Sequence, residues 1–148
     1  MFFVSIIVNC VLISTYVCAQ KENVPQIRGN KRVKRGHTLK IEIKNTTGNH
    51  IYLFDPMELQ IEQKVGEKWQ PLQVPYCPCD KVCPAPQSIK EMDENETAIF
   101  TWDLHETLCE NNQSKKRAVA KGKYRFIMHY GTNPSDRRNF VTHEFSVR

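Results

Sequence analysis

Residues 122–130 read GKYRFIMHY and show the clearest regular pattern in the chain. Every second residue from Tyr124 to Tyr130 is large and apolar, whereas Arg125 and His129 fall between them. A period of two residues is typical of a β-strand that buries one face and exposes the other. The segment therefore predicts a half-buried antiparallel strand.

The same period recurs on both sides of this segment, and turn residues or prolines separate the repeats. The strands that we expect cover residues 39–43, 51–53, 57–61, 69–74, 88–92, 98–102 and 141–147. About seven short strands without a sustained helical period predict an all-β, immunoglobulin-like antiparallel β-sandwich, with a small barrel as the alternative.

Two further expectations concern details of this fold. Trp69 and Trp102 are large enough to anchor its core. Residues 103–122 show no clear period, and they leave room for a short helix around Leu104 to Cys109.

The first 19 residues contain no charged side chain and are mostly apolar. Small or modest side chains at Val17-Cys18-Ala19 fit a signal-peptidase site, so we predict a signal peptide over residues 1–19. An uncleaved anchor, or a lipoprotein modified at Cys18, is the alternative. Cleavage would give a secreted, periplasmic or otherwise extracellular protein without stable membrane insertion.

The mature chain divides into an arm and one domain. Residues 20–35 are polar and end in Lys31-Arg32-Val33-Lys34-Arg35, which predicts an extended basic arm or, in a eukaryotic host, a convertase site. About 113 residues, 36–148, then remain for a single folded domain.

Four cysteines follow the signal peptide, and three of them lie in a proline-rich stretch, residues 76–86. An even number of cysteines in an exported domain predicts disulfides, with the connectivity left open. We expect two bridges that link this Pro/Cys loop to the sandwich through Cys77, Cys79, Cys83 and Cys109. The alternative is a copper or zinc site in which Cys77, Cys79 and Cys83 act as thiolates, with Cys109, His105 or His143 as the fourth ligand.

Three Asn-X-Ser/Thr sequons begin at Asn45, Asn95 and Asn112, in stretches that otherwise predict turns. In a eukaryotic secretory pathway they would be surface glycosylation sites.

No catalytic motif is present: the chain lacks Gly-x-Ser-x-Gly, His-Glu-x-x-His and a glycine-rich phosphate loop. The net charge is +5, from 21 basic and 16 acidic residues scattered along the chain, which is not a nucleic-acid-binding pattern. We therefore expect a non-enzymatic protein without a cofactor that binds a protein or cell-surface partner through its loops. The candidate binding residues are Tyr76, Asp80, Lys81, Arg137 and Arg138.

One family resemblance rests on three short motifs in order: Asn45-Thr46-Thr47, Thr101-Trp102-Asp103 and Lys121-Gly122-Lys123-Tyr124-Arg125. This layout resembles the small immunoglobulin-like domains of the intracellular proteinase inhibitor (BsuPI) type, from about His37 to the C-terminus. The resemblance implies a β-sandwich and adds protease inhibition as a further alternative function.

Overall fold

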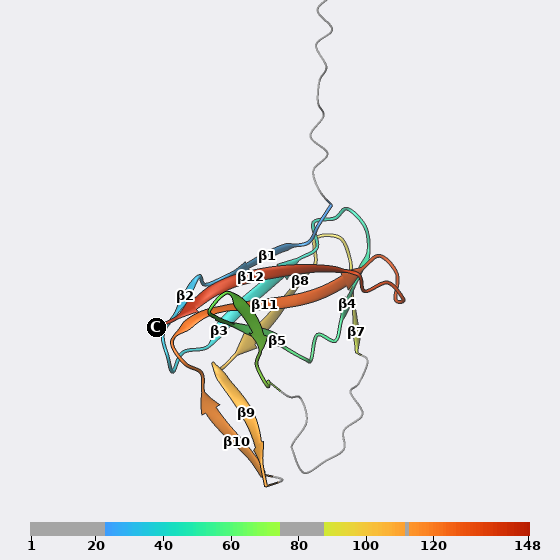
Figure 1. The fold of residues 1–148 in the computed structure, drawn as a ribbon. Coiled ribbons are helices and arrows are strands. Elements are labelled where there is room, and N and C mark those ends of the chain that lie inside the picture. Colours follow the sequence, from blue (N-terminus) through green and yellow to red (C-terminus); the bar gives the residue numbers. More distant parts are fainter. Residues whose placement is uncertain (1–22, 75–87, 112) are drawn as a thin grey trace, which may run out of the picture.

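The computed structural model describes residues 23–74, 88–111 and 113–148. In these ranges the chain forms twelve β-strands and no helix, so the predicted all-β class is confirmed (Figure 1). The strands form a sandwich-like arrangement of sheets that are antiparallel except for one pair. Among the same residues, no helix is long and apolar enough to cross a membrane.

The larger sheet contains residues 122–130, which belong to strand β11. Its strand order is β2-β12-β11-β4-β7, and a hairpin of β5 and β6 joins the same strand β11 beside β4. Strand β2, which comes earliest in the chain among the strands of this sheet, pairs in parallel with β12. The bounds are β2 (Arg32–Val33), β4 (Ile51–Phe54), β5 (Gln60–Val65), β6 (Lys68–Pro71), β7 (Ile89–Met92), β11 (Gly122–Gly131) and β12 (Asn139–Val147).

The smaller sheet has three strands in the order β1-β3-β8. A separate two-stranded hairpin, β9 and β10, projects from the body of the molecule (Figure 1). The bounds are β1 (Gln26–Gly29), β3 (Leu39–Lys44), β8 (Thr97–Trp102), β9 (His105–Glu110) and β10 (Gln113–Ala118).

The core lies between the two sheets and is formed by the alternating residues. On β11, Tyr124 and Phe126 are fully buried, as the period of two predicted. They meet β8 of the smaller sheet: the rings of Phe100 and Phe126 are 5.7 Å apart, and those of Trp102 and Tyr124 are 6.2 Å apart. Burial of such rings is the main stabilising contribution to a sandwich of this size.

The expectation that both tryptophans anchor the core is half right. Trp102 is buried, and its indole N–H donates to the carbonyl of His105 at 2.9 Å. Trp69 lies outside the core on β6, where the Arg125 guanidinium stacks 4.6 Å from its ring centroid. The β5–β6 hairpin is attached to one edge of β11, which leaves its tryptophan on the outer surface.

The expectation of an arm over residues 20–35 that ends before the folded domain is wrong for its described part. Strand β1 pairs with β3, strand β2 pairs with β12, and Val33 is only 4% exposed. Arg35 donates two hydrogen bonds to the carbonyl of Val119, at 2.9 and 3.0 Å. The domain therefore begins before Gly36, because backbone hydrogen bonds hold these polar residues to sheet edges.

The helix expected around Leu104 to Cys109 is also absent, because this stretch forms β9. Leu104 adopts a left-handed backbone conformation (φ 59°), which turns the chain out of β8 into the hairpin. Neither strand of this hairpin alternates between buried and exposed residues. Strand β10 is exposed along its whole length, and β9 is half-buried or exposed throughout. Strands β1, β2, β9 and β10, all without that pattern, raise the number of strands above the expected seven or so.

We predict that Val33→Ala lowers the free energy of unfolding by about 1–2 kcal/mol, because it removes two buried methyl groups from β2. Arg32→Ala changes the exposed neighbour on the same strand and should alter stability by less than about 0.5 kcal/mol. Chemical denaturation of both variants measures the difference. Equal, small effects would mean that residue 33 does not belong to the folded domain.

Candidate functional site

Most of the predicted Pro/Cys loop lies outside the described residues, including Cys77, Cys79, Cys83, Tyr76, Asp80 and Lys81. The fourth cysteine, Cys109, lies on the exposed part of β9 and is not a free thiol. Where the structure describes the chain, no three His, Cys, Asp or Glu side chains are grouped as metal ligands would be. The copper or zinc alternative therefore stays a prediction.

The two arginines of the expected binding loop, Arg137 and Arg138, form ion pairs within the protein. Arg137 pairs with Asp55 at 2.6 Å and lies over the ring of Phe54. Arg138 pairs with Asp136 at 2.8 Å, and its hydrogen bonds lower the pKa of that carboxyl to about 2. These pairs order the loop between β11 and β12, so neither guanidinium is available to a partner without breaking an ion pair.

Gly131 is required at the start of the same loop. A Cβ atom there would lie 1.7 Å from the carbonyl oxygen of Asp136, so only glycine fits.

Asn45 is not a surface glycosylation site, contrary to the expectation from its sequon. Its side chain is fully buried, and Nδ2, the atom that would carry a glycan, donates to the carbonyls of Asn49, Met92 and Asp93 at 2.7–3.2 Å. Its Oδ1 accepts hydrogen bonds from the N–H and hydroxyl of Thr47. The buried Asn45 side chain thus links two turns by hydrogen bonds, and a glycan on Asn45 is incompatible with this fold.

The other two sequons differ from it. Asn95 is exposed in the turn between β7 and β8, with a left-handed backbone (φ 65°). Asn112 lies outside the described residues.

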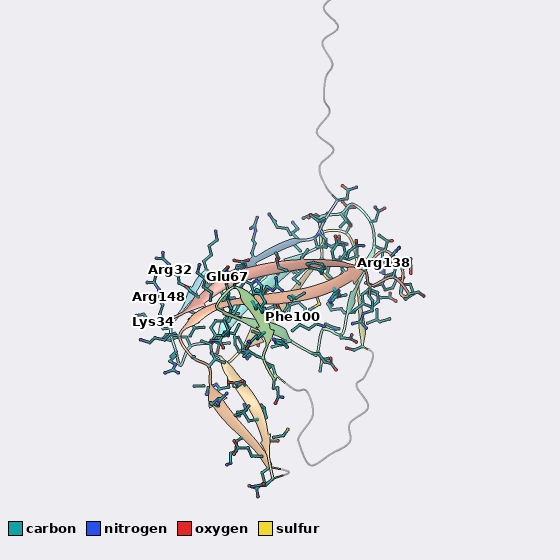
Figure 2. All side chains as sticks on the ribbon, viewed as in Figure 1. Arg32, Lys34, Glu67, Phe100, Arg138 and Arg148 are labelled. Carbon is teal, nitrogen blue, oxygen red and sulfur yellow. The ribbon has the colours of Figure 1, made fainter. Side chains whose placement is uncertain are left out.

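A group of exposed cations without ion pairs gathers at one end of the described chain. We call it the basic end: six exposed side chains, none with a carboxylate partner among the described residues. Figure 2 shows three of its members, Arg32, Lys34 and Arg148, at the same end of the molecule. The members are Lys31, Arg32, Lys34, Lys121, Lys123 and Arg148.

Strand pairing brings these residues together from three distant parts of the sequence. Arg32 on β2 is paired with Ser146 on β12, which in turn is paired with Lys123 on β11. Residues paired in this way point to the same face of a sheet, so Arg32 and Lys123 flank Ser146 on its outer side. The backbone N–H of Arg35 donates to the carbonyl of Arg148, which places residue 148 beside the segment 31–35.

Most cations elsewhere on the described chain have a carboxylate partner. Nine lysines and arginines outside the basic end have a carboxylate oxygen within 3.7 Å, the longest case being Lys64 with Glu67. The nine are Lys40, Lys64, Lys90, Lys115, Lys116, Arg117, Arg125, Arg137 and Arg138. Arg28, Arg35, Lys44 and Lys68 also have no carboxylate within ion-pair distance among the described residues, so the basic end holds six of the ten described cations that lack one.

An open groove of about 490 Å³ lies against β12 at this end. Lys31 and Lys123 contribute its cations, Thr142 and Ser146 its hydroxyls, and Glu144 a carboxylate. The remaining lining residues, Ile27, His143 and Phe145, contribute mainly buried or half-buried surface. We call this feature the β12 groove.

The opposite end of the same sheet carries apolar side chains on its outer face. Register places Phe140, His129, Phe54 and Ile89 in one row across four strands. Phe140 is 58% exposed, and its ring lies 5.8 Å from that of His129, whose buried Nδ1 has no hydrogen-bond partner among the described residues. The outer face is therefore basic at one end and apolar at the other.

The basic cluster at 31–35 is visible in the sequence, which predicts an extended arm there and not a binding surface. Lys121, Lys123 and Arg148 are isolated in the sequence, and only the β2–β12–β11 pairing makes them neighbours. The groove had no sequence signal, because its lining comes from four segments.

Comparison with known proteins assigns no relatives: no family model matches the chain, and no curated protein matches it.

We predict that Asn45→Ala lowers the free energy of unfolding by about 2–4 kcal/mol, since it leaves buried carbonyl groups without a donor. Asn49→Ala is the matched control, because Asn49 is exposed and only its backbone takes part in this network. Urea unfolding of both variants is the measurement. A cost for Asn45→Ala no larger than for its control would show that the buried amide does not hold the two turns.

Proposed function

We propose that the protein is an exported, non-enzymatic β-sandwich that binds an anionic partner at a cell surface or in the extracellular space. The binding region is the basic end, with its loops and strand ends. The observation that carries this proposal is the gathering of six cations without carboxylate partners at one end of the described chain, whereas nine of the thirteen described cations elsewhere are paired.

The physical argument is electrostatic. Exposed cations with no nearby carboxylate create a local positive potential that attracts anionic partners and speeds their association. Glu144 lines the groove at this end, and Glu67 in the β5–β6 turn already lies near Lys64. A paired lysine would have to give up its internal partner first, so the unpaired cations are the ones available for binding.

Export and cross-linking belong to the same proposal. The signal peptide expected over residues 1–19 would deliver the chain to an oxidising compartment, where four cysteines form disulfides. We place one bridge between Cys109 and one of Cys77, Cys79 or Cys83. Two facts support it: Cys109 is not a free thiol, and the N–H of Thr107 on the same strand donates to the carbonyl of Gln73 at 2.8 Å, just before the loop.

We also propose that this β-sandwich has an immunoglobulin-like topology. Two sheets that pack their aromatic residues against each other support it, with β8 on one side and β11 and β12 on the other.

We predict that alkylation of the denatured, secreted protein labels no cysteine before reduction and all four mature cysteines after it. Intact mass spectrometry reads the number of labels and, in the same spectrum, the N-terminal residue. Labelling of three or four cysteines without reduction, together with loss of a metal-sized mass on denaturation, would replace the disulfide proposal with the metal-binding alternative.

We predict that the secreted protein is retained on immobilised dextran sulfate in about 150 mM salt, but not on uncharged dextran of the same length. Retention should weaken as salt rises, because screening shortens the range of exposed charges. Lys34→Gln combined with Lys121→Gln should elute earlier than the wild type.

The matched control is Lys44→Gln combined with Lys115→Gln, which removes the same charge from exposed positions outside the basic end. Absence of retention, or equal losses in the two double variants, would reject the basic end as the binding region.

A further inference from the structure

We propose that the β12 groove is a binding site for a linear sulfated polysaccharide, whose sulfate groups contact Lys31 and Lys123. This inference rests on the proposed function and specifies both the ligand class and the site. The groove lies at the basic end and contains two of its six cations.

The two cations lie on different elements. Lys31 follows β1 in the connection to β2, and Lys123 is the second residue of β11, with β12 between β2 and β11. Both side chains are exposed, and neither has an ion pair among the described residues. A ligand lying along β12 therefore meets an ammonium group from each side.

The backbone positions of the groove are well defined. Ser146 donates its backbone N–H to the carbonyl of Lys31 at 2.9 Å, and its hydroxyl lies 3.3 Å from the same oxygen. The Nε2 atom of His143 lies 3.5 Å from the carbonyl of Asn30, and its ring stacks on Phe145. These contacts hold the Asn30–Lys31 connection against β12, so the binding residues need little ordering when a ligand arrives.

The shape of the site favours a linear chain. Outward-facing residues on a strand repeat about every 6.8 Å, so Thr142, Glu144 and Ser146 present polar groups along a path of roughly 14 Å. A polymer with repeated anionic groups can follow this path. A flat lipid surface would contact the protruding side chains of the basic end instead of the groove.

The composition of the groove disfavours nucleic acid. Proteins that bind single strands place aromatic side chains where bases can stack on them. The rings in this groove belong to Phe145, which is 4% exposed, and His143, which is 9% exposed, so neither offers an open face. The groove instead offers hydroxyl and ammonium groups, which can contact the sulfates and hydroxyls of a polysaccharide.

Glu144 is the single carboxylate among the described residues that line the groove, and it opposes an anionic ligand. Arg125, its partner in the register, is directed to Glu62 and Trp69 instead. Glu144 therefore makes a sharp test, because Glu144→Gln removes an unfavourable charge and should strengthen binding. A misfolded variant would not gain affinity.

The experiment measures binding of the full secreted protein to heparin, as a densely sulfated linear probe, over a series of salt concentrations. Lys31→Gln combined with Lys123→Gln should bind roughly 3- to 30-fold more weakly. The slope of log affinity against log salt should fall by about 2, one for each lost contact. Glu144→Gln should bind about 2- to 5-fold more tightly. The control with Lys44→Gln and Lys115→Gln should bind like the wild type.

The outcomes separate this inference from the proposed function. If heparin and dextran sulfate both fail to bind the wild type, the proposed function fails. If both bind but the groove variants match the wild type, only the groove is rejected. Tighter binding of single-stranded DNA, or of vesicles containing anionic phospholipid, than of heparin would reject the polysaccharide as the ligand class.

Discussion

The aromatic contact between the two sheets holds together every other part of this structure. Trp102 of the smaller sheet packs against Tyr124 and Phe145 of the larger one, with ring centroids 6.2 Å away in both cases. The polar atoms of this cluster also determine where the projecting hairpin leaves the body. The Trp102 indole donates to His105 at the start of β9, and the Tyr124 hydroxyl donates to Ala120 just after β10. Core packing and hairpin placement therefore depend on the same side chains.

The larger sheet combines a buried face with an outer face of two distinct characters. Its inner side is apolar along the whole of β11, because every second residue is packed against the smaller sheet. Its outer side changes along the same strands, from Lys123 at one end to His129 and its neighbour Phe140 at the other. An extended strand fixes the distance between such groups, so a partner of one end is held apart from a partner of the other.

The parts of the fold that could be predicted are those in which burial alternates. Residues 39–44, 97–102 and 122–131 carry apolar side chains at every second position, and each forms a strand. Strands β1, β2, β9 and β10 were missed because they are held largely by backbone hydrogen bonds, which leave little trace in side-chain composition. The basic end and the role of Asn45 also could not be predicted, because both depend on contacts between residues that are far apart in the sequence. The basic end depends on which strands pair, and Asn45 depends on carbonyl groups nearly fifty residues away in sequence.

The pairing of β2 with β12 also has a consequence for how the protein is made. Ser146 is bonded to Lys31, 115 residues earlier in the chain. Strand β2 has no partner until β12 has also been synthesised, and contacts this distant in sequence form slowly because of their loop-closure entropy. In that interval the positive segment 31–35 is exposed and unpaired beside the growing chain. Its charge keeps this free strand soluble and discourages it from pairing with other chains before its own partner arrives.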